Sequence, residues 1–304
     1  MLSVIVPATD SPPTLDACLE ALRTALPPGG EILVVDAPPG AGPAEARNLG
    51  ALRARGELLA FCDADVLVEP PALERIARRF DADPGLGALF GAYDDRPAAP
   101  GGVSRFRNLL HHHVHVRAEG PAETFWAGIG AVRREAFEAA GGFDAIRYPQ
   151  PAIEDIELGA RLRDRGERIE LDPAVRGTHL KRWTLTSMVT TDFARRGVPW
   201  VRLLAERRRA SSSLNLAPRQ ALAAVGAAVA TQGLLRRRPG RALAGAAVMV
   251  ASNAAFYWLL ARRGGARLAV AGVGLHAVHH LTALASVPAG LAAHAWARRA
   301  GSRA

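Results

Sequence analysis

The sequence predicts an α/β protein with a mostly parallel sheet flanked by helices, followed by an all-helical C-terminal region in or on a membrane. Short apolar runs alternate with amphipathic helical segments in the first part of the chain, and two of these runs end in a carboxylate. Residues 214–304, by contrast, are much more apolar than the rest of the chain. These observations separate a sheet-based domain from a helical tail.

Three apolar runs are predicted to be neighbouring parallel strands. They cover residues 2–7, 31–36 and 58–62, and amphipathic helices are expected over residues 14–25 and 44–55. Two strand–helix units that lead into a third strand form a right-handed, Rossmann-like half-sheet. The ends of the strands at Pro7, Asp36 and Asp63 are therefore expected side by side, an arrangement that suits a nucleotide.

The third strand ends in the sequence Asp63-Ala64-Asp65, inside the stretch LLAFCDADVLVEP at residues 58–70. Open α/β sheets bind their ligands at the carboxyl ends of the strands. Mg²⁺ and Mn²⁺ take oxygen ligands and are usually held by one or two carboxylates together with substrate phosphates. A divalent-metal site is one interpretation of this motif, and a plain acidic turn is the other.

Composition favours a membrane partner over nucleic acid. The formal net charge is +9 and comes almost entirely from arginines, which gather at the edges of apolar segments. Neither zinc-type spacing nor a nucleic-acid motif is present. Cys18 and Cys62 suggest no disulfide framework, and Met1 leads straight into a strand without the basic region of a signal peptide. We therefore expect a reduced, cytosol-facing domain.

Five blocks of sequence follow one another between residues 2 and 183: SVIVPATD, VVDAPPG, EARNLGALRARGELLAFCDADVLVEP, FWAGIGAVRREAFEAAGGFDA and AIEDIELGARLRDRG. In order and spacing they resemble family 2 glycosyltransferases of the GT-A fold, of the membrane-anchored bacterial type. The resemblance implies a catalytic domain over residues 1–183 that binds a nucleotide sugar. The family's usual D-D-G-S is here Asp36-Ala37-Pro38-Pro39, so UDP, GDP and dTDP all stay open as the nucleotide.

The resemblance also implies roles for individual residues. It places Arg47 near the base or the diphosphate, and it makes Asp65 the direct metal ligand with Asp63 beside it. The implied nucleotide-sugar-binding residues are Pro7, Ala8, Asp36, Arg47, Asp63, Arg182 and Trp183, and the implied metal ligands are Asp65, Asp63 and His179.

Glu154 and Asp155 begin a helix predicted over residues 153–165. Transfer of a sugar to a hydroxyl needs a general base next to the attacking oxygen, and a carboxylate can serve. Acidic residues in a first turn are also ordinary partners of the helix dipole. Together with the D-x-D motif, the order of the blocks favours Asp155 as the base and Glu154 as its neighbour or an acceptor contact.

The segment His179-Leu180-Lys181-Arg182-Trp183 resembles the Q-x-x-R-W motif of processive membrane members, with His in place of Gln. In other GT-A enzymes a histidine near this point completes the metal site, and the alternative is a histidine satisfied by a loop. Lys181 and Arg182 suit a diphosphate or a lipid phosphate. The missing Gln argues against a processive polymer synthase.

A cluster of histidines, HHHVH, occupies residues 111–115 of a predicted helix over 106–117. Histidines at this spacing can bind a transition metal. Packing in an interfacial or acceptor-side helix is the preferred interpretation, because no carboxylate completes a set of ligands.

The rest of the chain is assigned to the membrane. Residues 184–213 are predicted to be amphipathic interfacial helices with Trp183, Trp200 and three arginines at 207–209. Residues 214–304 contain apolar segments at 220–235, 242–261 and 268–296, for which two or three spans are expected. A soluble helical tail is the alternative, and arginines in both connecting loops leave the topology open.

These features together predict a multi-pass enzyme of the cell (plasma or inner) membrane. It would be a Mg²⁺- or Mn²⁺-dependent, inverting glycosyltransferase that uses a nucleotide sugar and a lipid or lipid-linked acceptor. One alternative is a polyprenyl-phosphate glycosyltransferase, in which the lipid phosphate itself is the acceptor. Another is a membrane scaffold that binds a nucleotide without turnover.

Overall fold

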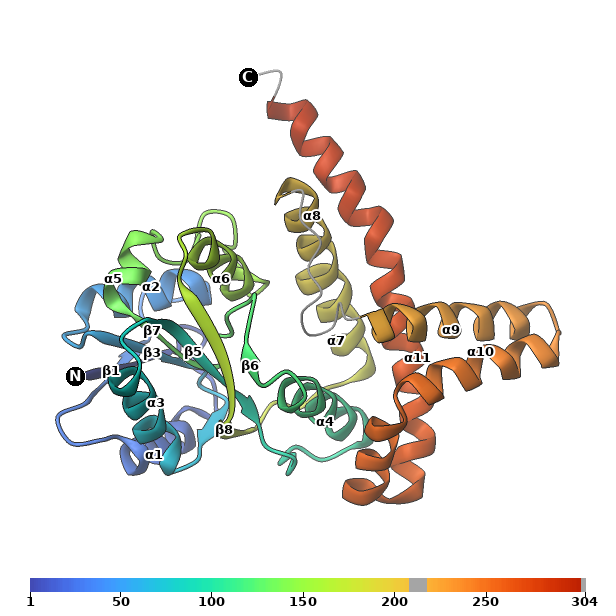
Figure 1. Cartoon of the computed structure of the whole chain (residues 1–304), viewed down its shortest axis with the longest axis horizontal. Helices are drawn as coiled ribbons and strands as arrows, with labels where there is room; N and C mark the ends of the chain where they lie inside the picture. The colour runs from blue at the N-terminus through green and yellow to red at the C-terminus, as the bar shows by residue number, and fades with distance from the viewer. Residues whose placement is uncertain (208–217, 302–304) are drawn as a thin grey trace. The chain divides into compact units, whose positions relative to one another are not determined.

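The computed structural model describes residues 1–207 and 218–301, which form two compact units (Figure 1). The first unit comprises residues 1–99 and 111–181, and the second comprises residues 100–110 and the described residues from 182 onward. The main division thus falls two residues before the predicted domain end at 183. The predicted boundary between 213 and 214 lies outside the described residues.

The first unit is built on an eight-stranded mixed sheet with the order β2-β1-β3-β7-β5-β8-β4, and β6 pairs with β8. β1 is parallel to both β2 and β3, as predicted, and β5 is parallel to β8. β7 lies antiparallel between β3 and β5, and β4 is antiparallel to β8. The strands are β1 (Leu2–Pro7), β2 (Glu31–Val35), β3 (Leu58–Cys62), β4 (Val66–Val68), β5 (Leu86–Tyr93), β6 (Gly120–Pro121), β7 (Ile129–Arg133) and β8 (Arg168–His179).

The second half of the sheet goes beyond the three parallel strands predicted from the sequence. β7 was not predicted, because its five residues lie in a segment rich in small residues and carry no clear alternation of apolar and polar residues. β8 is a single strand that contains Pro173. A shift in register, with Leu171 opposite Phe90 and Arg176 opposite Ala92, accommodates the proline inside the strand.

Helices cover both faces of the sheet (Figure 1). The face formed by Leu2, Val4 and Val6 belongs to one hydrophobic cluster with the buried side chains of α1 and α3. On the other face, α2 approaches so closely that a Cβ at Gly50 would collide with Ile5. The helices of this unit are α1 (Leu15–Ala25), α2 (Pro43–Arg53), α3 (Pro71–Ala82), α5 (Arg134–Ala139) and α6 (Glu154–Asp164), and α4 (Gly102–Val116) connects the two units.

The described part of the second unit is helical. The predicted pair of interfacial helices is a continuous helical path through α7 (Leu185–Thr190), a π-helix η1 (Thr191–Gly197) and α8 (Val198–Arg207). It is followed by α9 (Pro218–Leu235), α10 (Pro239–Ser252) and α11 (Ala254–Gly301). α9 and α10 pack as a tight hairpin, in which a Cβ at Gly226 would lie 2.8 Å from the carbonyl oxygen of Gly245.

The membrane segments differ from the expectation of two or three spans. The predicted span at 242–261 is divided at Asn253, where the backbone leaves the helical conformation between α10 and α11. α11 itself breaks at Gly265, with a φ of 76°, and Tyr257 Oη and His276 Nδ1 are 3.0 Å apart across the break. Among the described residues, length and apolar composition qualify one stretch to cross a bilayer, Ala254–Arg299, with a mean hydropathy of 1.4. Its part beyond Gly265 alone exceeds the ~20 residues that a span requires.

Candidate active site

The D-x-D motif forms a tight turn between β3 and β4. The backbone N–H of Val66 donates to the carbonyl of Asp63 at 3.0 Å, and the N–H of Leu180 donates to the carbonyl of Asp65 at 2.8 Å. The second bond ties the turn to the end of β8, where Val66 and His179 are partners in register. The motif is therefore held at the carboxyl end of β3, beside the last residue of β8.

Asp65 and His179 form the first polar pair of the site. Asp65 Oδ2 lies 3.4 Å from His179 Nε2, and the imidazole is buried while the carboxylate is half-buried. Burial acts to raise the pKa of Asp65, but the hydrogen bond and charge of His179 outweigh burial and hold that pKa below its usual range. Asp65 is thus kept as a carboxylate that faces an imidazole nitrogen.

This pair fits a divalent cation bound together with a substrate. Two ligand atoms that share one ion, each about 2.0–2.2 Å from it, lie roughly 3 Å apart, close to the observed separation. Within the described residues, no group of three His, Cys, Asp or Glu side chains is placed to hold a metal. Phosphates and water would have to supply the other ligands, as is usual for Mg²⁺ sites.

Asp63 belongs to a different cluster. Arg47 Nη2 lies 2.7 Å from Asp63 Oδ1, and Arg47 Nη1 lies 2.9 Å from Glu154 Oε1. Burial raises the pKa of Asp63, and the charge of Arg47 opposes that shift without cancelling it. Arg47 is only 4% exposed, and its guanidinium lies 5.4 Å from the centre of the Phe143 ring. These contacts form a clamp of three side chains from α2, the D-x-D turn and α6, in which Arg47 and Glu154 are buried and Asp63 is half-buried.

The clamp bears on three of the expected assignments. The predicted metal set of Asp63, Asp65 and His179 is not assembled, because the Asp63 carboxylate pairs with Arg47. Arg47 was expected at the base or diphosphate, but both of its terminal nitrogens bind protein carboxylates. Glu154 was expected as the neighbour of the base or as an acceptor contact; it is buried within the clamp, directly before Asp155 in the chain.

Asp155 is half-buried, unlike its buried neighbour Glu154. Its Oδ2 accepts a hydrogen bond from the N–H of Ala127 at 3.2 Å, and its Oδ1 accepts one from the N–H of Ile156 at 2.8 Å. The first bond links the first turn of α6 to the segment before β7. Both carboxylate oxygens are thereby oriented by backbone groups, which suits a side chain that must keep a fixed position.

The ends of β1 and β2 lie at the same edge of the sheet as the end of β3. The buried Ala8 donates its N–H to the carbonyl of Val35 at 2.8 Å, and Pro7 beside it is half-buried. Asp36 directly follows β2 and is exposed. The strand ends are therefore side by side as predicted, with the Asp36 carboxylate accessible to a ligand.

Arg182 and Trp183 belong to the second unit, so their assignment to the nucleotide sugar stays a prediction. Trp183 is buried there, and its backbone N–H donates to Ser104 Oγ at 2.8 Å. The guanidinium of Arg107 lies 5.4 Å from the centre of the Trp183 ring. These contacts give Trp183 a packing role within its own unit.

Tyr93, which the sequence analysis did not single out, stacks on His179. The two ring centres are 4.2 Å apart and the planes differ by 9°. Tyr93 is the last residue of β5, a fully buried strand next to β8. An aromatic residue at the end of a buried strand was the signal in the sequence that could have pointed to it.

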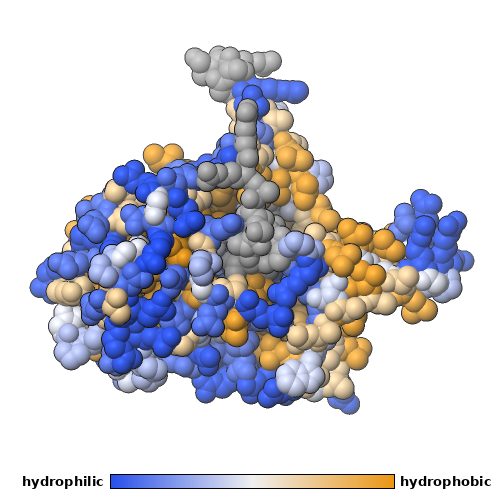
Figure 2. Space-filling model, in the orientation of Figure 1, coloured by the Kyte–Doolittle hydropathy of each residue, from blue (hydrophilic) through white to orange (hydrophobic). Residues whose placement is uncertain are grey.

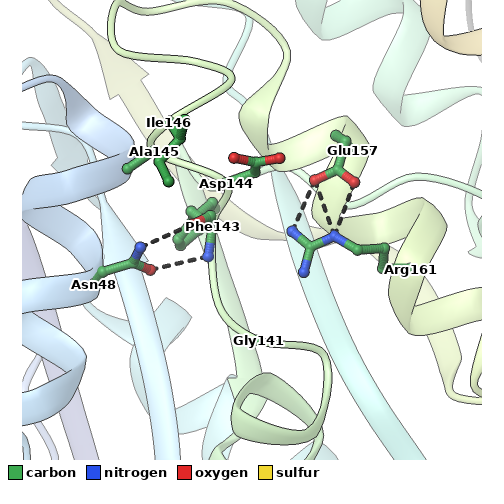
Figure 3. Close-up of a pocket in the computed structure, with 8 residues that line it drawn as sticks. All are labelled: Asn48, Gly141, Phe143, Asp144, Ala145, Ile146, Glu157 and Arg161. Atoms are coloured by element: carbon green, nitrogen blue, oxygen red, sulfur yellow. Dashed lines mark hydrogen bonds and ion pairs between the residues drawn. The ribbon is translucent and has the colours of Figure 1, made fainter. Parts of the chain in front are cut away.

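A surface pocket beside the clamp is lined by Asn48, Gly141, Phe143, Asp144, Ala145, Ile146, Glu157 and Arg161 (Figure 3). Asn48 bonds both the backbone N–H and the carbonyl of Phe143, and Glu157 forms an ion pair with Arg161 at 2.7 Å. These polar groups bind one another, so they fix the loop around Phe143. The polar groups of this pocket are therefore engaged with one another, whereas the Asp36 carboxylate at the end of β2 is exposed.

Comparison with known proteins agrees with this fold. The chain is similar to the mannosyltransferase PcManGT of Pyrobaculum calidifontis, solved with GDP-Man and Mn²⁺, with 20% identity, a TM-score of 0.56, and coverage of 95% of this chain and 86% of that one. A second similar structure is GalNAc-T7, solved with UDP, GalNAc and Mn²⁺, with 14% identity, a TM-score of 0.48, and coverage of 67% and 47%. No curated protein sequence matches the chain.

The mixed sheet with its flanking helices is that of a GT-A glycosyltransferase. The model of glycosyl transferase family 21 matches residues 45–292, and the chain belongs to that family. The predicted class of enzyme and its fold are confirmed, while the matching family is 21 rather than the family 2 that the motifs suggested.

Proposed function

We propose that the protein is a metal-dependent, inverting glycosyltransferase that moves a sugar from a nucleotide sugar to a lipid or lipid-linked acceptor. The observation that carries this proposal is the pair Asp65–His179 at the carboxyl end of the sheet, with Asp155 anchored in the first turn of α6. The two side chains of the pair match a cation bound to a diphosphate, and Asp155 matches a general base.

Each residue has a separate task in this mechanism. A bound Mg²⁺ or Mn²⁺ would neutralise the charge that develops on the leaving diphosphate. Asp65 and His179 would hold that ion, and Asp36 would accept a hydrogen bond from the ribose. The clamp of Arg47, Asp63 and Glu154 keeps the D-x-D turn and α6 in place. Asp155 takes the proton from the acceptor hydroxyl as it attacks the anomeric carbon from the side opposite the diphosphate.

The similar mannosyltransferase supports GDP-mannose as the first donor to test, because its structure contains GDP-Man and Mn²⁺. UDP- and dTDP-sugars remain in the panel, because Ala37-Pro38-Pro39 replaces the polar residues that usually follow the Asp at the end of β2.

The helical unit supports a membrane location for the protein. From residue 218 to the end, the sequence contains many arginines and neither Asp nor Glu. Large apolar side chains of the α9–α10 hairpin are exposed, including Leu234, Leu235 and Leu243 at 71–81%. Such a surface suits lipid rather than water, and a lipid acceptor would then lie close to the catalytic unit.

The test is donor hydrolysis by the detergent-purified protein across a panel of GDP-, UDP- and dTDP-sugars, with Mn²⁺ and with a chelator. We expect metal-dependent release from one donor, and loss of it in Asp65→Ala. If no donor is hydrolysed, the assay is repeated with a membrane-lipid extract as a source of acceptor. Nucleotide binding without turnover under both conditions would contradict the proposal and favour a scaffold.

A polyprenyl phosphate as the acceptor is the second candidate. The observation that favours it is that both oxygens of Asp155 already accept backbone hydrogen bonds, which reduces the capacity of this carboxylate to take a proton. For a hydroxyl acceptor, Asp155→Asn should lower kcat by roughly 10²–10⁴. For a phosphate acceptor the same variant should lose little activity, because the attacking oxygen is already ionised. The comparison requires turnover measured with each acceptor class.

A further inference from the structure

The histidine cluster on α4 is not used by the proposed function. Its members at 111, 112, 113 and 115 were considered as a transition-metal site or as packing. Within the described residues they contribute to no group of three metal-ligating side chains. Their contacts lead instead to the end of β5 and, through Tyr93, to His179.

Two of the histidines hold the backbone of β5. His112 Nδ1 lies 2.8 Å from the carbonyl oxygen of Tyr93, and His115 Nδ1 lies 3.1 Å from the carbonyl oxygen of Gly91. β5 forms parallel pairs with β8, with Tyr93 opposite Gly177, two residues before His179. The end of β5 is therefore anchored from the side of α4 and from the side of β8.

Aromatic rings continue the connection from α4 to the candidate metal pair. The ring of His111 lies 4.4 Å from that of Tyr93, and the edge of Trp126 approaches Tyr93 at 4.8 Å. Tyr93 is 6% exposed and stacks almost parallel on His179 at 4.2 Å. A buried ring stacked on an imidazole restricts rotation of that imidazole about its terminal torsion, which is otherwise broad.

We propose that Tyr93 is a positioning residue that holds the His179 imidazole with Nε2 toward Asp65, and that His111 and His112 hold Tyr93 in turn. This inference rests on the proposed function, because it assumes that Asp65 and His179 bind the cation. Groups that orient a metal ligand typically change metal affinity by roughly 10–100-fold when they are removed. The cluster on α4 would then support the metal site from outside it.

The test measures binding of Mn²⁺ alone to the purified full-length protein, by the electron paramagnetic resonance signal of free Mn²⁺. Tyr93→Leu removes the stacked ring and should raise the Kd for Mn²⁺ by roughly tenfold or more. Tyr93→Phe keeps the ring and should stay within about twofold of wild type. In donor hydrolysis, Tyr93→Leu should need more Mn²⁺ for half-maximal rate, while kcat at saturating Mn²⁺ changes little.

A matched control separates positioning from a general loss of packing. Phe80→Leu removes a buried ring from α3, where the ring lies against the Arg133 guanidinium, and should leave the Kd for Mn²⁺ unchanged. If Tyr93→Leu does not fold, His111→Leu is measured instead, since it removes a contact of Tyr93 and keeps the Tyr93 ring.

The outcomes distinguish this inference from the proposed function. If the wild type binds Mn²⁺ and Asp65→Ala abolishes binding, but Tyr93→Leu or His111→Leu binds as the wild type does, the positioning role is wrong and the metal site stands. An equal loss in Phe80→Leu would also overturn the positioning role. If the wild type binds no Mn²⁺ alone, the measurement is repeated with GDP present, whose phosphates can supply the other ligands. If the wild type then binds no more Mn²⁺ than GDP binds in buffer, both the metal site and the inference fail.

Discussion

At the residue scale, neighbouring carboxylates have opposite environments at two places in this site. Asp65 faces His179, while Asp63 faces Arg47, and Asp155 is half-buried while Glu154 is buried against the same arginine. In each pair, one carboxylate is bound to the buried Arg47 and the other is not. Residue type alone predicts a chemical role for all four, whereas their contacts set Asp65 and Asp155 apart from the two that pair with Arg47.

The structural role of Glu154 in the clamp can be tested directly. Glu154→Ala leaves the buried Arg47 guanidinium with one partner fewer, and removal of one partner from a buried ion pair typically costs about 3–5 kcal/mol. We expect a clearly lower midpoint of chemical unfolding. Glu20→Ala is the control, because its pair with Arg23 is exposed and contributes little. Equal stability of the two variants would contradict a structural role for Glu154.

At the scale of elements, the π-helix η1 places a carboxylate inside a helical unit. Asp192 Oδ1 lies 2.6 Å from an Arg107 guanidinium nitrogen, and Asp192 Oδ2 lies 2.7 Å from His279 Nδ1. Burial acts to raise the pKa of Asp192, but the charge of Arg107 and the bond from His279 outweigh it and lower that pKa to about 2. Asp192 thus connects three helical elements, α4, η1 and α11.

This lowered pKa predicts how stability depends on pH. Because the folded-state pKa of Asp192 is below the ordinary value near 3.8, its contribution is complete above about pH 4 and is lost as the pH falls toward 2. The contribution is on the order of 2 kcal/mol. Asp192→Asn should therefore lower the thermal midpoint at pH 6 and reduce the fall in that midpoint between pH 4 and 2. Parallel pH profiles for the two proteins would contradict the prediction.

At the scale of the whole molecule, the two units of the chain differ in the surface they carry. The first unit carries the strand ends and the paired carboxylates, and the second carries the exposed apolar helices. Figure 2 shows apolar residues along the α9–α10 hairpin and hydrophilic residues at its tip. The exposed arginines Arg236, Arg237, Arg238 and Arg241 lie at this tip.

The arginines at the tip of the hairpin predict that the protein binds anionic lipid surfaces more tightly than neutral ones. Each arginine near an anionic surface contributes about 1 kcal/mol, or roughly fivefold in affinity. Replacing the four arginines of the tip by glutamine should reduce co-sedimentation with phosphatidylglycerol-containing vesicles and leave binding to pure phosphatidylcholine vesicles unchanged. The control is Arg23→Gln, which changes an exposed arginine on α1 of the first unit. An equal reduction with both kinds of vesicle would argue against a charge effect.

Much of the catalytic unit could be predicted from the sequence, because its signals are local. The strands β1, β2 and β3, the helices between them and the placement of Asp63 and Asp65 after β3 follow from short apolar runs and their periodicity. The order of five motif blocks was sufficient to indicate a GT-A glycosyltransferase, and the family match confirms that class.

What only the tertiary structure decided depends on residues far apart in the chain. Three features join segments that no local pattern connects: β7 inserts antiparallel beside β3, Arg47 pairs with Asp63 and Glu154, and Tyr93 stacks on His179. The breaks at Asn253 and Gly265, which leave one candidate span among the described residues, also depend on how the helices pack. The sequence by itself determined which residues stand at the strand ends, and packing decided which of them pair with one another, because those partners come from segments far apart in the chain.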